Sequence, residues 1–248
     1  MKIIYSISIL VLALLAISVP VHASKLDSSI ESSAKHSYVF KTYLKDDDIK
    51  IQSSDGVVTL TGSVSEDSHK TLAQETVAGL PGVKTVNNML EVQGTPPTST
   101  SDAWLTSKVK TTLLFHRNVS TMTEVNTKEG IVTLHGDAAS QAEKDLTTEY
   151  VKDVEGVKDV NNEMTVTKTA KKTRTAGEKI DDASITAQVK MSLLYHRSTS
   201  AIKTSVTTKK GIVTLSGKAS SAAELKLVTK YANDVNGVKE VKNRMSVE

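Results

Sequence analysis

The chain has 248 residues, of which 38% are hydrophobic, and it contains no cysteine. Thiol catalysis, cysteine-ligated metals and disulfide bonds are therefore excluded. The formal net charge of +3 is unevenly distributed: residues 169–248 hold 15 Lys and Arg against 7 Asp and Glu, whereas residues 24–94 and 95–168 each carry a net charge of −3. The positive charge lies in the last third of the chain.

Residues 1–23 are typical of a signal peptide. Lys2 precedes an apolar run from Ile3 to Val19, and Val21-His22-Ala23 matches a small-residue cleavage site. We therefore predict cleavage after Ala23 and export of the mature chain. A retained membrane anchor is the alternative, but the run is at the short limit for spanning about 30 Å of hydrocarbon.

One pattern occurs three times, as D-G-V-V-T-L-T-G over 55–62, E-G-I-V-T-L-H-G over 129–136 and K-G-I-V-T-L-S-G over 210–217. In each copy another glycine follows 20 residues later. The repeated glycines are Gly56, Gly62, Gly82, Gly130, Gly136, Gly156, Gly211, Gly217 and Gly237. The copies are 74 and 81 residues apart, longer than the period of about 20 to 50 residues that is typical of a solenoid. The pattern therefore predicts three small domains.

The boundaries of these domains follow from composition. We place the first at 24–94, the second at 102–168 and the third at 181–248. Residues 95–101 are rich in Pro, Ser and Thr, and residues 169–180 form a basic tract rich in Thr, Lys and Arg. Both segments lack apolar periodicity, so we expect them to be linkers.

Each unit predicts the same order of elements. In the first, a helix over 29–44 is followed by a strand near 49–51, a hairpin turn at Asp55-Gly56 and a second strand over 57–60. A second helix then runs from Ser65 to Pro81-Gly82, and a last strand follows over 83–92. We predict an α+β fold of three tandem two-layer αββαβ domains, each a three-stranded sheet covered by two helices.

The later copies contain clearer helix signals. Ser140 with Glu143, and Ser221 with Glu224, have the spacing of capping boxes at the start of the second helix. In the opening helices, Leu105, Val109 and Leu113 lie on one side, as do Ile185, Val189 and Leu193. These six residues are predicted to be core.

Catalysis and metal binding have little support. The histidines are scattered, and only His116 and His196 are equivalent in the repeat. Each precedes an arginine, Arg117 or Arg197, at the end of an opening helix, where a cation complements the dipole of that helix. No pair of residues has metal-ligand spacing, and the glycines match neither a P-loop nor a dinucleotide-binding motif. We expect turn and strand-end glycines, no catalytic residues, no metal and no cofactor.

The repeated motifs are T-x-x-V-K-x-x-L-L, then x-G-(I/V)-V-T-L-x-G, then G-V-x-x-V-x-N-x-(M/L). Together they resemble the BON domain, named for bacterial OsmY and nodulation proteins, over nearly all of residues 29–248. The resemblance implies an αββαβ fold, a periplasmic location and a non-enzymatic role in envelope stress that involves phospholipid surfaces. This chain has three units, and no cysteine follows Ala23, so a lipid-anchored lipoprotein is excluded.

An anionic phospholipid surface is the partner that we expect, bound peripherally by apolar side chains flanked by cations. The apolar candidates are Trp104, Leu114, Phe115, Leu194 and Tyr195; the cationic candidates are Lys108, Lys110, Lys190 and Arg197, with Lys171, Lys172 and Arg174 in the linker. Two alternatives remain open. Trp104 packs against its sheet or a neighbouring domain, and Leu114 and Leu194 are buried between domains.

The leading hypothesis is a periplasmic protein that supports envelope integrity under osmotic or other stress. Its binding to anionic membranes should weaken steeply with salt. The alternative is a chaperone-like or protein-interaction module that binds polypeptides, including other envelope proteins. Nucleic acid is not an expected partner, because an exported chain seldom meets it and no aromatic and basic platform for single strands is visible. No small-molecule substrate is expected either.

Overall fold

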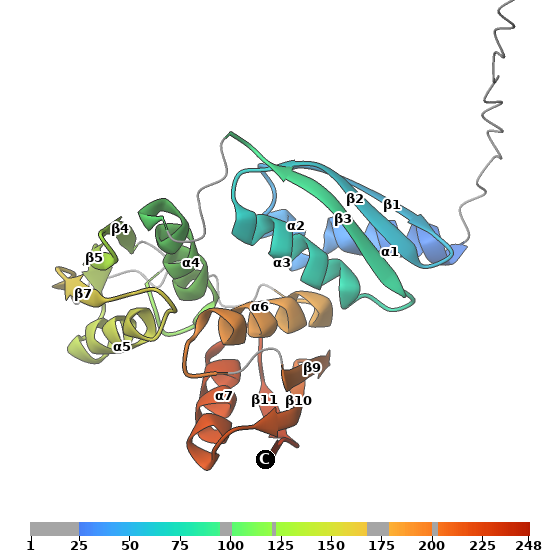
Figure 1. Ribbon diagram of the computed structural model, residues 1–248. Helices are drawn as coiled ribbons and strands as arrows, with labels where there is room; N and C mark the ends of the chain where they lie inside the picture. The colour runs from blue at the N-terminus through green and yellow to red at the C-terminus, as the bar shows by residue number, and fades with distance from the viewer. Residues whose placement is uncertain (1–24, 95–100, 121–122, 168–178, 200–202) are drawn as a thin grey trace, which may run out of the picture.

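The structure is a computed structural model that describes residues 25–94, 101–120, 123–167, 179–199 and 203–248 (Figure 1). The predicted signal peptide, most of the first linker, and Lys171, Lys172 and Arg174 lie outside the described residues. Three units follow one another: 25–94, 101–167 and 179–248. Among the described residues, none of the helices is both long and apolar enough to span a bilayer.

The three units share one order of elements. The first contains α1 Lys25–His36, α2 Tyr38–Thr42, β1 Asp48–Ser54, β2 Val57–Val64, α3 Asp67–Ala78 and β3 Thr85–Val92. The second contains α4 Asp102–Phe115, β4 Glu124–Lys128, β5 Ile131–His135, β6 Asp137–Ala138, α5 Gln141–Lys152, β7 Asp159–Asn162 and β8 Thr165–Val166. The third contains α6 Asp182–Tyr195, β9 Thr204–Lys209, β10 Ile212–Ala219, α7 Ala222–Asp234, β11 Glu240–Asn243 and β12 Ser246–Val247. The predicted αββαβ fold is confirmed.

In every unit the central strand pairs with one antiparallel and one parallel neighbour. β2 is antiparallel to β1 and parallel to β3, and β5 and β10 have the same arrangement. The parallel pair requires a crossover, which α3, α5 and α7 supply across one face of each sheet. In the second and third units the last strand is divided into two short segments, of which the later pairs with β6 or with the end of β10.

The opening helix of the first unit differs from the prediction. A single helix was expected over 29–44, but the chain breaks at Ser37 between α1 and α2. The Ser37 hydroxyl donates to the carbonyl of Ala34 at 2.8 Å and accepts from the amide of Phe40 at 3.4 Å. Because this side chain ends one helix and caps the next, it favours a bend.

Helix α6 lies at the centre of the molecule, where it contacts α3, α4 and α7 (Figure 1). One face, with Ile185, Val189 and Leu193, joins a core shared by the second and third units. The opposite face, with Ala187 and Met191, joins the core of the first unit. The three units therefore pack into one body, and α6 is buried on nearly all sides.

Candidate functional site

The repeated glycines have structural roles. All nine have φ between +79° and +129°, a range that L side chains rarely adopt. At Gly62 and Gly217 a Cβ atom would lie 2.0 Å from the carbonyl oxygen of Asp48 and 1.9 Å from that of Lys203. These positions need glycine because the neighbouring strand passes too close for a side chain.

An aspartate holds the hairpin turn in each unit. Asp102 accepts hydrogen bonds from the amides of Glu129 and Gly130 at 2.7 and 2.9 Å, and Asp182 does the same for the third unit. Asp27 makes the equivalent contacts in the first unit. Sequence reasoning missed these residues, although an Asp precedes the turn glycine by 28 or 29 residues in every copy.

An asparagine ties the last strand to the second helix. In the second unit Asn162 donates to the carbonyl of Lys144 and the hydroxyl of Thr148, and accepts from the amide of Met164. Asn88 and Asn243 make the corresponding bonds in the other units. The most specific residues of the repeat thus build the fold.

The ionisable groups with shifted pKa values lie inside the molecule. Burial raises the pKa of the Tyr150, Tyr195 and Tyr231 hydroxyls, and burial lowers the pKa of His196. All of these side chains lie where units meet, and no group of three or more acidic or histidine side chains among the described residues is placed to hold a metal ion. The shifted groups therefore belong to joints between units.

Two of the predicted aromatic contacts are buried. Phe115 is fully buried against the first unit, with its ring centroid 5.6 Å from that of Tyr43, and Tyr195 is 8% exposed. Neither ring can reach a membrane in this arrangement, because the neighbouring units cover it. Leu114 is partly buried against the core of the first unit, which agrees with the alternative that it lies between domains. Leu194 is 44% exposed and so is not buried between domains.

Most of the cations predicted to bind lipid make contacts within the protein instead. Lys108 is buried; its ammonium donates to the carbonyl of Glu155 at 3.1 Å and lies 4.3 Å from the Trp104 ring centroid. Burial lowers the pKa of Lys108, and the Glu155 carboxylate opposes that effect. Lys190 pairs with Glu75 of α3 at 2.7 Å. Arg197 is exposed, but its guanidinium donates to backbone carbonyls of the second unit. Within the described residues, Lys110 is thus the one predicted cation that is exposed and makes no ion pair or side-chain hydrogen bond, and Trp104 is half-buried.

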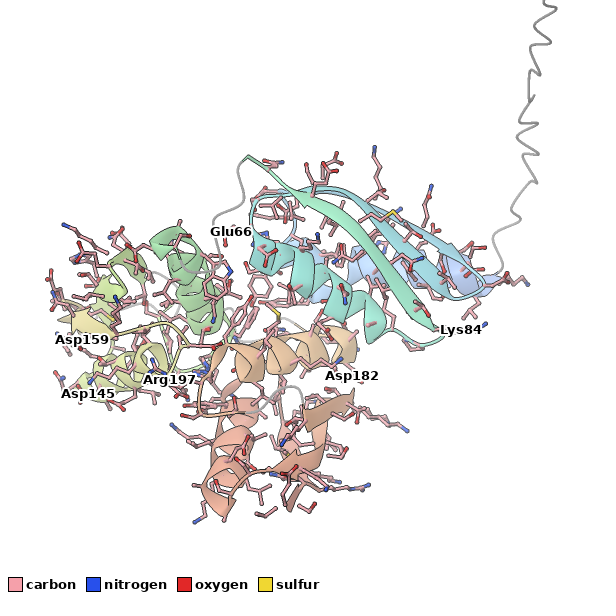
Figure 2. The ribbon with its side chains drawn as sticks, in the orientation of Figure 1. Glu66, Lys84, Asp145, Asp159, Asp182 and Arg197 are labelled. Carbon is pink, nitrogen blue, oxygen red and sulfur yellow. The ribbon has the colours of Figure 1, made fainter. Side chains whose placement is uncertain are left out.

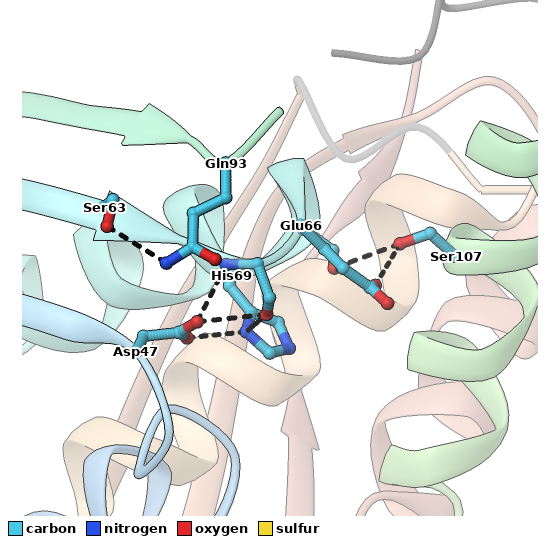
Figure 3. A network of polar contacts seen from close by, with 8 residues as sticks. Asp47, Ser63, Glu66, His69, Gln93 and Ser107 are labelled. Carbon is cyan, nitrogen blue, oxygen red and sulfur yellow. Dashed lines mark hydrogen bonds and ion pairs between the residues drawn. The ribbon is translucent and has the colours of Figure 1, made fainter. Parts of the chain in front are cut away.

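The first and second units meet through a small polar contact (Figure 3). Ser107 of α4 donates to the carboxylate of Glu66, at the start of α3. Nearby, Asp47 accepts from Nδ1 of His69 at 2.6 Å, which ties α3 to the loop before β1. These contacts join α3 to α4 and to the loop before β1.

An arginine of each of the second and third units donates hydrogen bonds to backbone carbonyls of the other unit. The Arg117 guanidinium donates to the carbonyls of Val235 and Val238, just beyond the end of α7, at 2.9 and 2.7 Å. Arg197, whose position Figure 2 shows, makes the matching bonds beyond the end of α5. The sequence interpretation was that these arginines complement the dipoles of their own helices. That interpretation missed the bonded partner, since each guanidinium donates to carbonyls just beyond the end of the second helix in the other unit.

The outer faces of the sheets are the surfaces on which the units differ most. In the third sheet, Val206, Val213 and Leu215 point to the helices, so the alternate residues face outward. The outward charged residues are Lys209, Lys218, Lys242, Arg244 and Glu240. We call this surface the cationic sheet face. Lys242 approaches Glu240 at 4.0 Å, and the other three cations make no recorded ion pair within the described residues.

The outer sheet face of the second unit is mostly acidic, and two of its positions carry the opposite charge to their equivalents in the third unit. Its outward residues include Glu124, Asp137, Asp159 and Glu163 against one cation, Lys128, and Figure 2 shows Asp159 at the outer edge of this unit. Asp137 occupies the position of Lys218, and Glu163 that of Arg244, because the two units are offset by 81 residues. We call this surface the acidic sheet face. Two sheets with one backbone pattern thus present opposite electrostatic surfaces.

Comparison with known proteins agrees with the repeat. The family model described as BON domain matches residues 26–94, 101–168 and 181–248. The chain is 33% identical over 143 residues to Osmotically-inducible protein Y of Escherichia coli (strain K12), covering 56% of this chain and 71% of that protein. It is 35% identical over 141 residues to an uncharacterized protein in the gshII 5'region of Anaplasma centrale, covering 56% of this chain and 90% of that one.

Among solved structures, the chain is similar to CdsD, a structural protein of the type III secretion system of Chlamydia trachomatis. The identity is 15%, the TM-score is 0.24, and the match covers 89% of this chain and 92% of that chain. A likeness at this level carries no argument about fold or function. The family-model matches, by contrast, span all three units and coincide with the repeated glycines, aspartates and asparagines, and on that basis this chain belongs to the BON-domain family.

Proposed function

We propose that this chain is a non-enzymatic protein of the bacterial periplasm that binds anionic phospholipid surfaces peripherally and supports the envelope under osmotic stress. The observation that carries the proposal is the cationic sheet face of the third unit. The predicted signal peptide supports export, and the name of the Escherichia coli relative states osmotic induction for that protein.

The cationic sheet face suits a charged bilayer better than the opening helices do. Each Lys or Arg close to an anionic leaflet contributes about 1 kcal/mol, and the attraction falls off within a Debye length. Four such residues on one exposed face are worth about 4 kcal/mol before the repulsion of Glu240 is counted. Ile212, the first residue of β10, is only partly buried at one end of this face and supplies a shallow apolar contact.

The acidic sheet face of the second unit gives the bound molecule an orientation. An anionic leaflet repels Glu124, Asp137, Asp159 and Glu163 by the same electrostatics that attract the third unit. The protein should therefore lie with its third sheet toward the lipid and its second sheet toward the aqueous phase. The exposed Leu194 and the half-buried Trp104 then make, at most, a second contact.

Liposome co-sedimentation tests the proposal with the mature chain, residues 24–248. We expect binding to vesicles that contain anionic lipid, little binding to zwitterionic vesicles, and weaker binding at physiological than at low salt. The double variant Lys242→Glu/Arg244→Glu removes two cations worth about 2 kcal/mol and adds repulsion, so affinity should fall by at least about 30-fold.

A matched control has the same change of net charge at a different place. Lys45→Glu/Lys50→Glu alters two exposed lysines of the first unit and should leave binding nearly unchanged. An equal loss in both double variants would mean that only net charge matters and would refute the assigned face. If Trp104→Ala were the only variant to lose lipid binding, the membrane contact would lie on the opening helix of the second unit. Suppression of client aggregation without any lipid affinity would favour the chaperone-like alternative.

A further inference from the structure

Two histidines face each other in the joint between the second and third units. Nε2 of His116 lies 3.3 Å from Nε2 of His196, and both side chains are buried. Each ring is stacked on a tyrosine of its own unit with a centroid distance of 3.9 Å, His116 on Tyr150 and His196 on Tyr231. The four rings form one continuous aromatic cluster across the joint.

The tyrosines connect this cluster to the opposite unit. The Tyr150 hydroxyl donates to Asp234 of the third unit, and the Tyr231 hydroxyl donates to Asp153 of the second unit at 2.6 Å. Asp153 also lies 3.4 Å from Nδ1 of His196. The joint is therefore closed by side chains whose hydrogen bonds depend on protonation.

Two ring nitrogens at 3.3 Å can share only one proton. One Nε2 donates its N–H and the other accepts it. Because Asp153 lies beside Nδ1 of His196, we assign the proton of His196 to Nδ1 and the shared proton to Nε2 of His116. One additional proton preserves this bond, but a pair of two imidazolium ions would place two N–H groups and two like charges against each other.

We propose that His116 and His196 form a proton-operated latch, which holds the second and third units together and opens when both imidazoles become protonated. The inference goes beyond lipid binding and does not depend on it. It rests on the facing Nε2 atoms, on their burial between two units, and on the reciprocal hydrogen bonds that break if the units part.

The charged groups around the latch do not remove the cost of the second proton. Asp153 and Asp234 favour a cation, whereas Lys230, Arg117 and Arg197 oppose one. Tyr150 and Tyr231 stay protonated because burial raises the pKa of both hydroxyls, and Glu149 also acts on Tyr231. Burial lowers the pKa of His196, and the hydrogen bond and charge of Asp153 offset only part of that effect.

The direction of the pH effect follows from proton linkage. A histidine whose pKa is lowered in the closed joint binds its proton more readily in the open one, so closure is fully favoured above the ordinary pKa of about 6.5. Below that pH, each proton taken up only by the open form shifts the equilibrium by up to about tenfold per pH unit. Between pH 7 and pH 5 the shift is up to about 25-fold for one proton that only the open form takes up.

The lack of cysteine makes a distance measurement straightforward, because introduced cysteines are the only labelling sites. Asn126→Cys and Thr207→Cys place spin labels on exposed strand positions of the second and third units. We expect one narrow label-to-label distance at pH 8, a longer and broader distribution at pH 5, and recovery when the pH is returned to 8. In His116→Gln/His196→Gln, which cannot be protonated in this range, the narrow distance should persist at both pH values.

Two further measurements keep the test decisive. His36→Gln, in the first unit and away from the joint, should respond to pH as the parent does. Imidazole NMR signals of the unsubstituted chain need no variant, and those of His116 and His196 should titrate only as the joint opens. The proposal is overturned if the distance is unchanged at pH 5, if the glutamine pair opens as the parent does, or if both imidazoles titrate near 6.5 in a closed joint.

Discussion

Replacing Asn162 by alanine tests the assignment of the repeated asparagine to the fold. Nδ2 of Asn162 donates to the carbonyl of Lys144 at 2.9 Å and to the Thr148 hydroxyl at 2.8 Å, and its Oδ1 accepts from the amide of Met164 at 3.0 Å. Each hydrogen bond contributes about 1 kcal/mol, and the amide of the buried Met164 would lose its partner at an additional cost of about 1 kcal/mol or more. We expect the free energy of unfolding of the second unit to fall by about 3 to 4 kcal/mol.

Trp104 is the only tryptophan of the chain and lies on α4, so its fluorescence during urea unfolding reports on the second unit. The matched control is Asn161→Ala, one residue earlier, because Asn161 is exposed and its side chain, among the described residues, bonds only to the exposed Glu163 carboxylate. That change should cost less than about 0.5 kcal/mol. A loss below about 1 kcal/mol in Asn162→Ala, or equal losses in the two variants, would refute the structural assignment and make the repeated asparagine a candidate binding residue.

Two other substitutions test the sheet and the joint. Gly217→Ala would place Cβ 1.9 Å from the carbonyl oxygen of Lys203 and should destabilise the third unit by more than about 3 kcal/mol in thermal unfolding. Gly94→Ala, at a positive φ of 76° but with open space around the added Cβ, should cost only about 1 kcal/mol. Arg117→Met removes three charged hydrogen bonds to carbonyls at and just beyond the end of α7 and should weaken the joint by about 3 kcal/mol or more. Because the joint is reciprocal, Arg197→Met should have a similar effect, and a large difference between them in urea unfolding would contradict the symmetric description.

The sequence predicted the elements that depend on local signals. The hairpin turns follow from a residue and a glycine that both take positive φ, as at Lys210 with φ of 55° and Gly211 with φ of 80°. The capping interactions at Ser140 and Ser221 are present. Each serine hydroxyl accepts from the amide three residues later, and the glutamate at that position accepts from the amide of the residue before the serine. These interactions span few residues, so a short pattern is enough to indicate them.

The packing between units could not be predicted in the same way. Ile185, Val189 and Leu193 are core, as their spacing predicted. The opposite side of α6, with Ala187 and Met191, is buried by the first unit, although a helical pattern does not say which distant surface covers it. One signal was available: α6 has no charged residue between Asp182 and Lys190, and a helix without a charged face is usually buried.

The candidate site was harder to predict than the fold, for a physical reason. Interfacial aromatic and basic residues on a helix have the same composition whether they meet a membrane or another domain. Lys108, Phe115 and Tyr195 were placed at a lipid surface by that composition, and the structure uses all three between units. The cationic sheet face left a weaker signal, the +8 charge of residues 169–248, because its residues come from three strands.

The arrangement of the units explains why the outer sheet faces are the surfaces left for binding. Figure 1 shows α3, α4 and α6 together in the interior and the three sheets toward the outside. Each αββαβ unit has one covered and one open sheet face, and packing through the helices leaves all three open faces in solvent. Since the turn and strand residues of the repeat are fixed by the fold, the outward strand positions are where units can differ without loss of stability. Opposite charge at Asp137 and Lys218, on one backbone pattern, is the result expected when one unit is adapted to bind an anion and its neighbour is not.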